Sequence, residues 1–402
     1  MGNAIRWKRK ITLPAVCISV YGAIYLSVAW RYTSTVVHPR AALSHSNETD
    51  CPGVLSHMMR GYWKPYPALL QRELLQILQE KFLISYRLNR GIPKNLSRSD
   101  GKCGNVTFSN TRFGIYRALC DPSGPTPCCY EGYCVSRSVQ DCKCEDCFDV
   151  RQRIQAESSV WIPSDHRCHV EDFDSETACD ILKDSTIFFS GNSLLRQIFM
   201  ALTMILRGDL RHALQEPQTV VEMCDGLDNM LGPCQFEMEK RPDVCNGRVN
   251  ITFVYKPHAR NIHEPFRAID ELKHKPKTMI FLGVGLHDHY NYEKVYFKYC
   301  RRILKHFRAQ NAIWPKFLWA STHATGLLKS PHMRSQSYKS GRYFNEWLKP
   351  RLDKEGMPIF DTFNMTDGVV SPDGCHHGLT VNMLKARFFL HYIAELQRKG
   401  EW

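Results

Sequence analysis

The chain has 402 residues, of which 43% are hydrophobic, and a formal net charge of +13 at pH 7. This length and composition exclude a wholly disordered chain and allow one large domain with extensions or two ordinary domains. The basic residues lie in short scattered clusters without interleaved aromatic side chains, which argues against nucleic-acid binding. A mildly basic surface suits acidic glycans or anionic donors, but it is equally typical of an ordinary solvated face.

The first 30 residues have the pattern of a membrane anchor. Residues 11–30 contain no charge and are long enough to cross a bilayer as a helix, and residues 1–10 form a leader with four basic side chains. The positive charge predicts a cytosolic N-terminus, hence a single-pass type II protein whose remaining chain lies across the membrane. A cleaved signal peptide is the alternative, although its apolar region is usually shorter.

Sequons and cysteines favour the lumen of the secretory pathway for the rest of the chain. Of the 17 cysteines only Cys17 lies in the predicted span, so sixteen remain for an oxidising compartment. Their pairing cannot be deduced from the sequence. The five N-x-[ST] sequons all follow the span and are candidate glycosylation sites: Asn47, Asn95, Asn105, Asn250 and Asn364.

Two segments follow the anchor. Residues 31–100 are expected to form a stem and a helical segment, with one helix over 67–85 where apolar residues recur at helical spacing. Residues 101–180 are rich in cysteine, glycine and proline. The spacing Cys142-x-Cys144-x-x-Cys147 is compatible with a zinc site, but disulfides are the stronger expectation in an oxidising compartment.

Residues 181–402 alternate between short apolar runs and longer amphipathic stretches. We expect strands within 186–190, 251–255, 278–285, 316–322 and 357–363, and helices over 291–309 and 378–398. Short apolar strands joined by helices predict an α/β class domain, a three-layer α/β/α sandwich with a mostly parallel five-stranded sheet. Sites of such sheets lie at the carboxyl ends of the strands.

The stretch "FFSGNSLLRQ" puts a hydroxyl at such a strand end. Ser193 follows Gly191 and Asn192 at the start of the next helix, where free backbone N–H groups and the helix dipole can stabilise an oxyanion. The G-x-S-x-G elbow is absent, because Leu195 occupies its second glycine position. The structural alternative is that Asn192 or Ser193 only caps the helix.

A base for Ser193 is available near the end of the chain. In "SPDGCHHG" the carboxylate of Asp373 is three residues from His376, close enough to accept a hydrogen bond from the ring and fix its tautomer. His377 is the competing histidine. We expect its ring to point elsewhere, as a neighbour of the site or a surface residue.

These motifs resemble the SGNH (GDSL-type) superfamily, whose members have G-D-S after the first strand and D-x-x-H before the last helix. The segment "WIPSDHRC" and the match of Arg196 and Gln197 are similar to the PC-esterase branch, which includes trichome-birefringence-like, sialate O-acetyltransferase and neurexophilin/PC-esterase domain proteins. The resemblance spans about residues 120–398. It implies a catalytic triad of Ser193, Asp373 and His376. Asn192 departs from the usual aspartate, which leaves open an impaired catalyst.

The end of the third strand, "LGVGLHDHY", supplies a candidate oxyanion site. Where the superfamily has G-x-N-D, this chain has Gly285-Leu286-His287-Asp288, so His287 is expected to replace the asparagine as donor and Gly285 to leave room for the acyl group. Two alternatives remain for His287: it orients the loop, or it binds zinc together with His289. Beside the backbone N–H of Ser193, either Gly285 or His287 is expected to hold the oxyanion. Further candidates for oxyanion or substrate binding are Gly191, Asn192 and Arg196, the last of which could instead form a plain salt bridge.

The resemblance and the expected anchor together imply a function. We expect a glycan O-acetyltransferase with a serine acyl-enzyme in a Golgi lumen, with no bound cofactor or metal and with an acetyl donor such as acetyl-CoA as co-substrate. The alternatives are a glycan O-acetylesterase and a non-catalytic binding or adhesion ectodomain at the cell surface. The sequence does not identify the acceptor sugar, the donor or the oligomeric state.

Overall fold

The computed structural model describes residues 51–68, 96–108, 116–144, 146–208 and 243–402. The predicted anchor and nearly all of the helix expected over 67–85 lie outside these ranges. Within them, no helix combines the length and the apolar character needed to span a bilayer. Residues Cys51–Trp402 form one compact unit.

A five-stranded parallel sheet forms the centre of this unit. Its order is β6 (Asn250–Tyr255), β5 (Thr186–Gly191), β7 (Thr278–Gly283), β8 (Lys316–Ala320) and β9 (Ile359–Phe360). Each of the five strands overlaps one of the five apolar runs of the sequence, so the predicted sheet is confirmed. Every residue of β5 and β7 is buried, as expected for strands covered on both faces.

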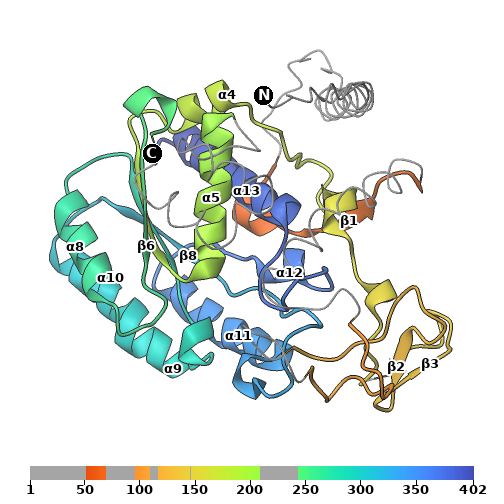
Figure 1. Ribbon diagram of the computed structural model, residues 1–402. Helices are drawn as coiled ribbons and strands as arrows, with labels where there is room; N and C mark the ends of the chain where they lie inside the picture. Colours follow the sequence, from red (N-terminus) through yellow and green to blue (C-terminus); the bar gives the residue numbers. More distant parts are fainter. Residues whose placement is uncertain (1–50, 69–95, 109–115, 145, 209–242) are drawn as a thin grey trace, which may run out of the picture. The chain divides into compact units, whose positions relative to one another are not determined.

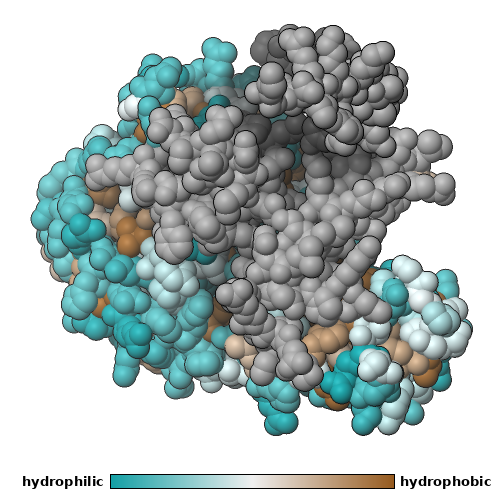
Figure 2. Space-filling view, viewed as in Figure 1, coloured by the Kyte–Doolittle hydropathy of each residue, from teal (hydrophilic) through white to brown (hydrophobic). Residues whose placement is uncertain are grey.

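Helices cover both faces of the sheet (Figure 1). Successive side chains of a strand point to opposite sides, so Phe189 joins the core under α5 (Ser193–Arg207) and α13 (Leu379–Arg398). Its neighbour Phe188 joins the second core, under α8 (His263–Leu272), α10 (Arg301–Ala309) and α11 (Tyr338–Lys354). The surface over α8 and α10 is largely hydrophilic (Figure 2), because these helices turn their apolar faces to the sheet. The predicted three-layer sandwich is therefore present.

The strand order determines where a site can form. The chain runs from β5 to β6 on one side and then returns past β5 to β7. Loops that leave neighbouring strands in opposite directions open a crevice at the carboxyl ends of those strands. Here the crevice lies beyond β5 and β7, where Gly191 and Gly283 are paired in register.

The segment before the sheet packs onto the same core. Strand β1 (Gly61–Pro65) pairs antiparallel with β4 (Ser159–Pro163), and Trp63 and Trp161 make an edge contact with their ring centroids 5.5 Å apart. The Val54 N–H donates to the Glu395 carboxylate of α13 at 2.7 Å. Residues 51–68, expected in a stem, thus belong to the compact unit. Their strand β1 lacks the apolar alternation that would have predicted it.

The cysteine-rich segment is held by disulfides, as expected. It contains the hairpin β2 (Cys128–Tyr130) and β3 (Tyr133–Val135). Cys142, Cys144 and Cys147, the zinc alternative, are all oxidised. The disulfides among the described residues are Cys51–Cys168, Cys103–Cys129, Cys120–Cys134, Cys128–Cys142, Cys144–Cys147 and Cys179–Cys245.

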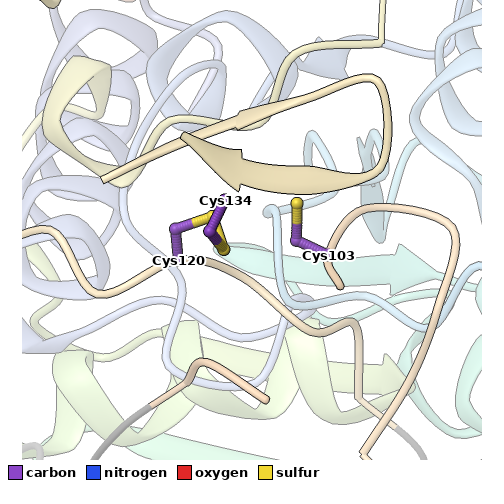
Figure 3. Close-up of side chains that lie close together, drawn as sticks. All are labelled: Cys103, Cys120 and Cys134. Carbon is purple, nitrogen blue, oxygen red and sulfur yellow. A yellow bond between two sulfur atoms is a disulfide. The ribbon is translucent and has the colours of Figure 1, made fainter. Parts of the chain in front are cut away.

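Three cysteine sulfurs gather beside the hairpin, those of Cys103, Cys120 and Cys134 (Figure 3). They lie within 4.8 Å of one another, a spacing that would suit a metal ion. Each belongs to a disulfide, however, since Cys120 is bonded to Cys134 and Cys103 to Cys129. Metals bind thiolates, and the sulfurs of a disulfide are not thiolates. The cluster is therefore a pair of neighbouring structural disulfides.

The remaining elements are short. Helix α4 (Ser175–Ile181) packs on α5 and α13, α9 (Tyr292–Val295) on α11, and α12 (Phe363–Thr366) on β1. Together with a π turn at Tyr296–Cys300, α9 and α10 fill the predicted helical stretch 291–309, and α13 matches the prediction for 378–398. Single 3-10 or π turns also cover Val54–Met58, Val150–Gln152, Ala156–Ser158, Cys245–Gly247, Leu286–Asp288 and Arg334–Gln336.

Candidate active site

The turn from β5 into α5 places Ser193 in the crevice. A Cβ at Gly191 would lie 2.3 Å from the carbonyl oxygen of Gly283, so only glycine allows the two strand ends to approach this closely. The Asn192 N–H donates to that carbonyl at 3.0 Å. The end of β5, from which Ser193 follows, is thereby held against the end of β7.

Asn192, and not Ser193, caps helix α5. The Asn192 Oδ1 accepts hydrogen bonds from the N–H groups of Leu194 and Leu195, at 3.0 and 3.4 Å. Asparagine and aspartate are about equally good at this position, so the exchange of the usual aspartate for asparagine keeps the cap. The Ser193 hydroxyl is consequently available for another partner, which decides between the two alternatives left open by the sequence.

That partner is His376. Its Nε2 lies 2.8 Å from the Ser193 Oγ, and its Nδ1 lies 2.7 Å from the Asp373 Oδ2. An ionised carboxylate can only accept, so the ring donates from Nδ1; in the neutral imidazole Nε2 then presents its lone pair to the hydroxyl. The structure brings together the three residues expected to form a triad, in the order that general-base activation of a serine requires.

The loop that carries Asp373 and His376 is tightly held. The Asp373 Oδ1 accepts from the backbone N–H groups of Cys375 and His376, at 2.9 and 2.8 Å. The Ser371 hydroxyl donates to the His376 carbonyl at 2.6 Å. Gly374 has φ +82°, and a Cβ there would lie 2.1 Å from the Lys329 nitrogen. One carboxylate therefore organises the loop and orients the ring at the same time.

The start of α5 provides positive electrostatic potential at Ser193. Ser193 is the first residue of a 15-residue helix, and its N–H belongs to the first turn, where no intrahelical acceptor exists. The dipole of such a helix favours negative charge at this end. An oxyanion formed on a substrate bonded to the Ser193 Oγ would lie at this end of the helix.

His287 lies beside the triad, and its neighbours are other rings. The ring centroids of His258 and Tyr255 are 5.7 and 6.5 Å from that of His287. Burial lowers the pKa of His287, and the charges of His258 and His376 lower it further. His287 is therefore a neutral imidazole near His376, able to donate one N–H, as an oxyanion donor must.

The backbone at Gly285 requires glycine. Its φ of +137° is accessible essentially only to glycine, and a Cβ would lie 2.7 Å from the Phe344 ring. That Gly285 leaves room for an acyl group stays a prediction. Glycine is required for the backbone turn that leads to His287.

Arg196 lies one turn after Ser193. Its guanidinium carbon is 5.2 Å from the centroid of the Tyr255 ring, within the range of a cation–π interaction. Tyr255 itself is 39% exposed. This contact with Tyr255 fits packing at the site, one of the roles considered for Arg196.

Sequence reasoning assigned no role to Asp288, which organises the loops around His287. Its carboxylate is buried, accepts from the Ala259 N–H at 2.7 Å and forms an ion pair with Lys294 at 2.6 Å. His258 Nδ1 lies 3.8 Å from it. Asp288 follows His287 directly in "GLHDHY", and its burial could not be inferred from that pattern. His377, expected as a neighbour or a surface residue, is buried, so the surface alternative was wrong.

The sequons divide into two groups. Asn105, Asn250 and Asn364 are exposed and accessible for glycosylation. Asn47 and Asn95 lie outside the described residues. Modification at any of the five stays a prediction.

Comparisons with known proteins identify relatives. Residues 161–393 match the family model described as NXPE family member 4-like, C-terminal domain. No curated protein matches the chain. A solved structure of a lipolytic G-D-S-L family member from Veillonella parvula is similar at 15% identity and TM-score 0.32, covering 53% of this chain and 100% of its own. A carbohydrate acetylesterase from Sinorhizobium meliloti is similar at 13% identity and TM-score 0.32, covering 53% and 99%.

Proposed function

We propose that this chain, which belongs to the NXPE family member 4-like C-terminal domain family and to the PC-esterase branch of the SGNH-like superfamily, transfers acyl groups through a covalent intermediate on Ser193. The main support is the chain of hydrogen bonds from Asp373 through His376 to Ser193. The Asp373 Oδ2 lies 2.7 Å from the His376 Nδ1, and the His376 Nε2 lies 2.8 Å from the Ser193 Oγ. This arrangement lies at a helix N-terminus in the crevice of a parallel sheet, where both a nucleophile and an oxyanion are supported.

The chemistry proceeds in two halves. The Ser193 Oγ attacks the acyl carbonyl carbon while its proton moves to the His376 Nε2, giving a tetrahedral oxyanion. Protonated His376 then gives this proton to the leaving group, and the carbonyl re-forms as an ester on Ser193. In the second half His376 takes a proton from the acceptor hydroxyl while the acceptor oxygen attacks the ester carbonyl, giving a second tetrahedral oxyanion. This oxyanion collapses with breakage of the bond to the Ser193 Oγ, and His376 returns the proton to that oxygen. Asp373 stabilises the imidazolium in both halves.

We assign the oxyanion to the Ser193 N–H and to His287. Donors of this kind are each worth about 3 kcal/mol in the barrier. Support for His287 comes from its lowered pKa, which keeps the ring neutral, and from its position near His376. The half-exposed rings of Tyr255, His258 and His287 offer apolar faces and polar edges suited to a sugar.

The proposed acceptor is a glycan hydroxyl and the proposed acyl group is acetyl, which makes the protein a glycan O-acetyltransferase. Acetyl-CoA or another activated acetyl compound would serve as co-substrate. With water as the acceptor, the same triad would make it an O-acetylesterase. We further propose a Golgi location with the described unit in the lumen, or alternatively at the cell surface. Six disulfides and three exposed sequon asparagines among the described residues support an oxidising compartment.

Two measurements test this function. The compact unit Cys51–Trp402, produced as a secreted protein and called the secreted unit below, should react with a fluorophosphonate probe. Ser193→Ala should abolish this reaction without reducing secretion. Incubation with a labelled acetyl donor and a glycan panel should give labelled sugar with wild type and none with His376→Ala. Loss of acetyl from a pre-acetylated glycan, without transfer, would identify the esterase. A folded wild type that is inert to the probe would contradict acyl chemistry and favour a binding ectodomain.

A further inference from the structure

The backbone that follows His376 is held by a side chain of helix α13. Asn382 is completely buried, and its Nδ2 donates to the carbonyl oxygens of His377 and Gly378, at 2.9 and 2.8 Å. Together with the bond from Ser371 to the His376 carbonyl, three consecutive carbonyls, beginning with that of the proposed base, accept hydrogen bonds from buried or partly buried side chains. The position of the imidazole along the loop thus depends on the orientation of one amide.

Lys385 contacts the other end of that amide. It lies one helical turn after Asn382, is completely buried, and its Nζ is 3.5 Å from the Asn382 Oδ1. The two loop carbonyls can only accept, so they face the amide nitrogen, and Lys385 then donates a hydrogen to the amide oxygen. Lys385 therefore supports the orientation in which Asn382 holds the loop.

His323 holds Lys385 in turn. The Lys385 Nζ lies 2.8 Å from the Nε2 of His323, which follows the end of β8 and is itself buried. The His323 ring also lies against that of His377, with their centroids 5.5 Å apart. Buried polar groups consequently connect the end of β8 with the loop that carries His376. The connection runs from His323 to Lys385 and Asn382 on α13, and from Asn382 to the carbonyls of the loop.

Lys385 has an unusual environment for a lysine. Across the described ranges, no carboxylate lies within ion-pair distance of its Nζ. Burial lowers the pKa of Lys385 well below its ordinary value, which favours the neutral amine. Burying an amine without an ion-pair partner costs free energy, whereas a methionine of similar volume would avoid that cost. The hydrogen bonds of the Lys385 amine to His323 and Asn382 therefore explain why lysine, rather than an apolar residue, occupies this position.

We propose that His323, Lys385 and Asn382 form a positioning network that keeps the His376 Nε2 at hydrogen-bonding distance from the Ser193 Oγ. The proposal rests on the proposed function, since it assigns these residues a role through the base. None of the three touches the reacting atoms, so they are positioning residues. Their removal should slow the chemical step while leaving Ser193 and His376 present.

The test measures the rate and the final extent of fluorophosphonate labelling of the secreted unit. Lys385→Met and Asn382→Leu should each slow labelling by about tenfold to a hundredfold, because a displacement near 1 Å between reacting groups costs this much. Labelling should still reach completion. A merely destabilising change would instead lower the labelled fraction and leave the rate constant of the folded molecules unchanged.

A control on the same helix is Glu395→Gln, which weakens the bond to the Val54 N–H far from the triad and should leave the rate constant unchanged. Wild-type rate constants in folded Lys385→Met and Asn382→Leu would overturn the network. If Lys385→Met is not secreted, Asn382→Leu alone decides. Absence of labelling in wild type would overturn the proposed function instead, so the two failures are distinguishable.

Discussion

The Ser193 Oγ and the His376 Nε2 lie 2.8 Å apart although 183 positions separate the two residues in the chain. Both lie just beyond the sheet, Ser193 after β5 and His376 before α13, so the parallel fold itself brings them together. The Asp373 carboxylate completes the series from within the same short loop as His376.

The first prediction concerns this carboxylate. Asp373→Asn keeps the shape of the side chain but removes the charge and allows the wrong tautomer of His376. Acyl transfer should fall by about 10³ to 10⁴-fold, as when the aspartate of a serine triad is replaced by its amide. The rate of labelled acetyl transfer measures this. Asp353→Asn, an exposed site on α11, is the control, and equal rates for the two variants would count against the triad.

The cap of α5 gives a stability prediction. Because Asn192 accepts from Leu194 and Leu195, Asn192→Ala should lower the free energy of unfolding by about 1 kcal/mol. Asn192→Asp keeps an acceptor oxygen and should stay within about 0.5 kcal/mol of wild type. Urea unfolding of the secreted unit checks both. A destabilisation by aspartate as large as that by alanine would show that the asparagine nitrogen, not the cap, matters.

The oxyanion assignment is tested at His287. Replacement by leucine removes the N–H donor and should lower kcat by about 10² to 10³-fold, while glutamine, which retains a donor, should recover part of the loss. His289 is two residues away, exposed and hydrogen-bonded to Ser335. His289→Leu should leave kcat near the wild-type value. If leucine at 287 changes only KM, His287 binds substrate and does not stabilise the oxyanion.

Two glycines with positive φ should differ sharply in their tolerance of alanine. Gly285 has no space for a Cβ because of Phe344, so Gly285→Ala should cost about 3 kcal/mol or more through strain and overpacking. Gly356 also has positive φ, +70°, but nothing lies within 4 Å of the position that a Cβ would occupy, and Gly356→Ala should cost only about 1 to 2 kcal/mol. Thermal unfolding of both variants provides the comparison. Equal losses would mean that Phe344 moves aside.

Stability should decrease on acidification through the buried His377 and the partly buried His391. Burial lowers the pKa of His391 to about 4 and that of His377 to about 3, from 6.5. The unfolded chain therefore binds protons first, and stability present above pH 6.5 is lost as the pH falls toward these values. His391 alone should contribute about 3 kcal/mol of this loss.

The variant His391→Phe tests the contribution of His391. It preserves the ring contact with Phe173 and removes the titrating group. The difference in free energy of unfolding between pH 7 and pH 4.5 should become smaller by roughly 2 kcal/mol. In this interval the unfolded imidazole, with its ordinary pKa of 6.5, takes up its proton, whereas the folded one, with a pKa of about 4, stays mostly neutral. An unchanged difference would mean that His391 is accessible to protons in the folded state.

Much of the α/β unit could be predicted because its signals are local. Each strand is an apolar run, and Ser193 and His376 follow and precede regular elements whose edges are visible in the sequence. The pairing of β1 with β4 could not be predicted, since it depends on contacts across about a hundred residues. The same is true of the disulfide pairing and of Lys385 and His323, whose burial and distance from each other are products of tertiary packing alone.

The bond between Cys51 and Cys168 spans 117 positions of the chain. A single proteolytic cut anywhere between these two cysteines would produce two fragments that migrate together until a reducing agent separates them. An intact band on a non-reducing gel is therefore no proof of an uncleaved polypeptide for this protein, and preparations require comparison under both conditions.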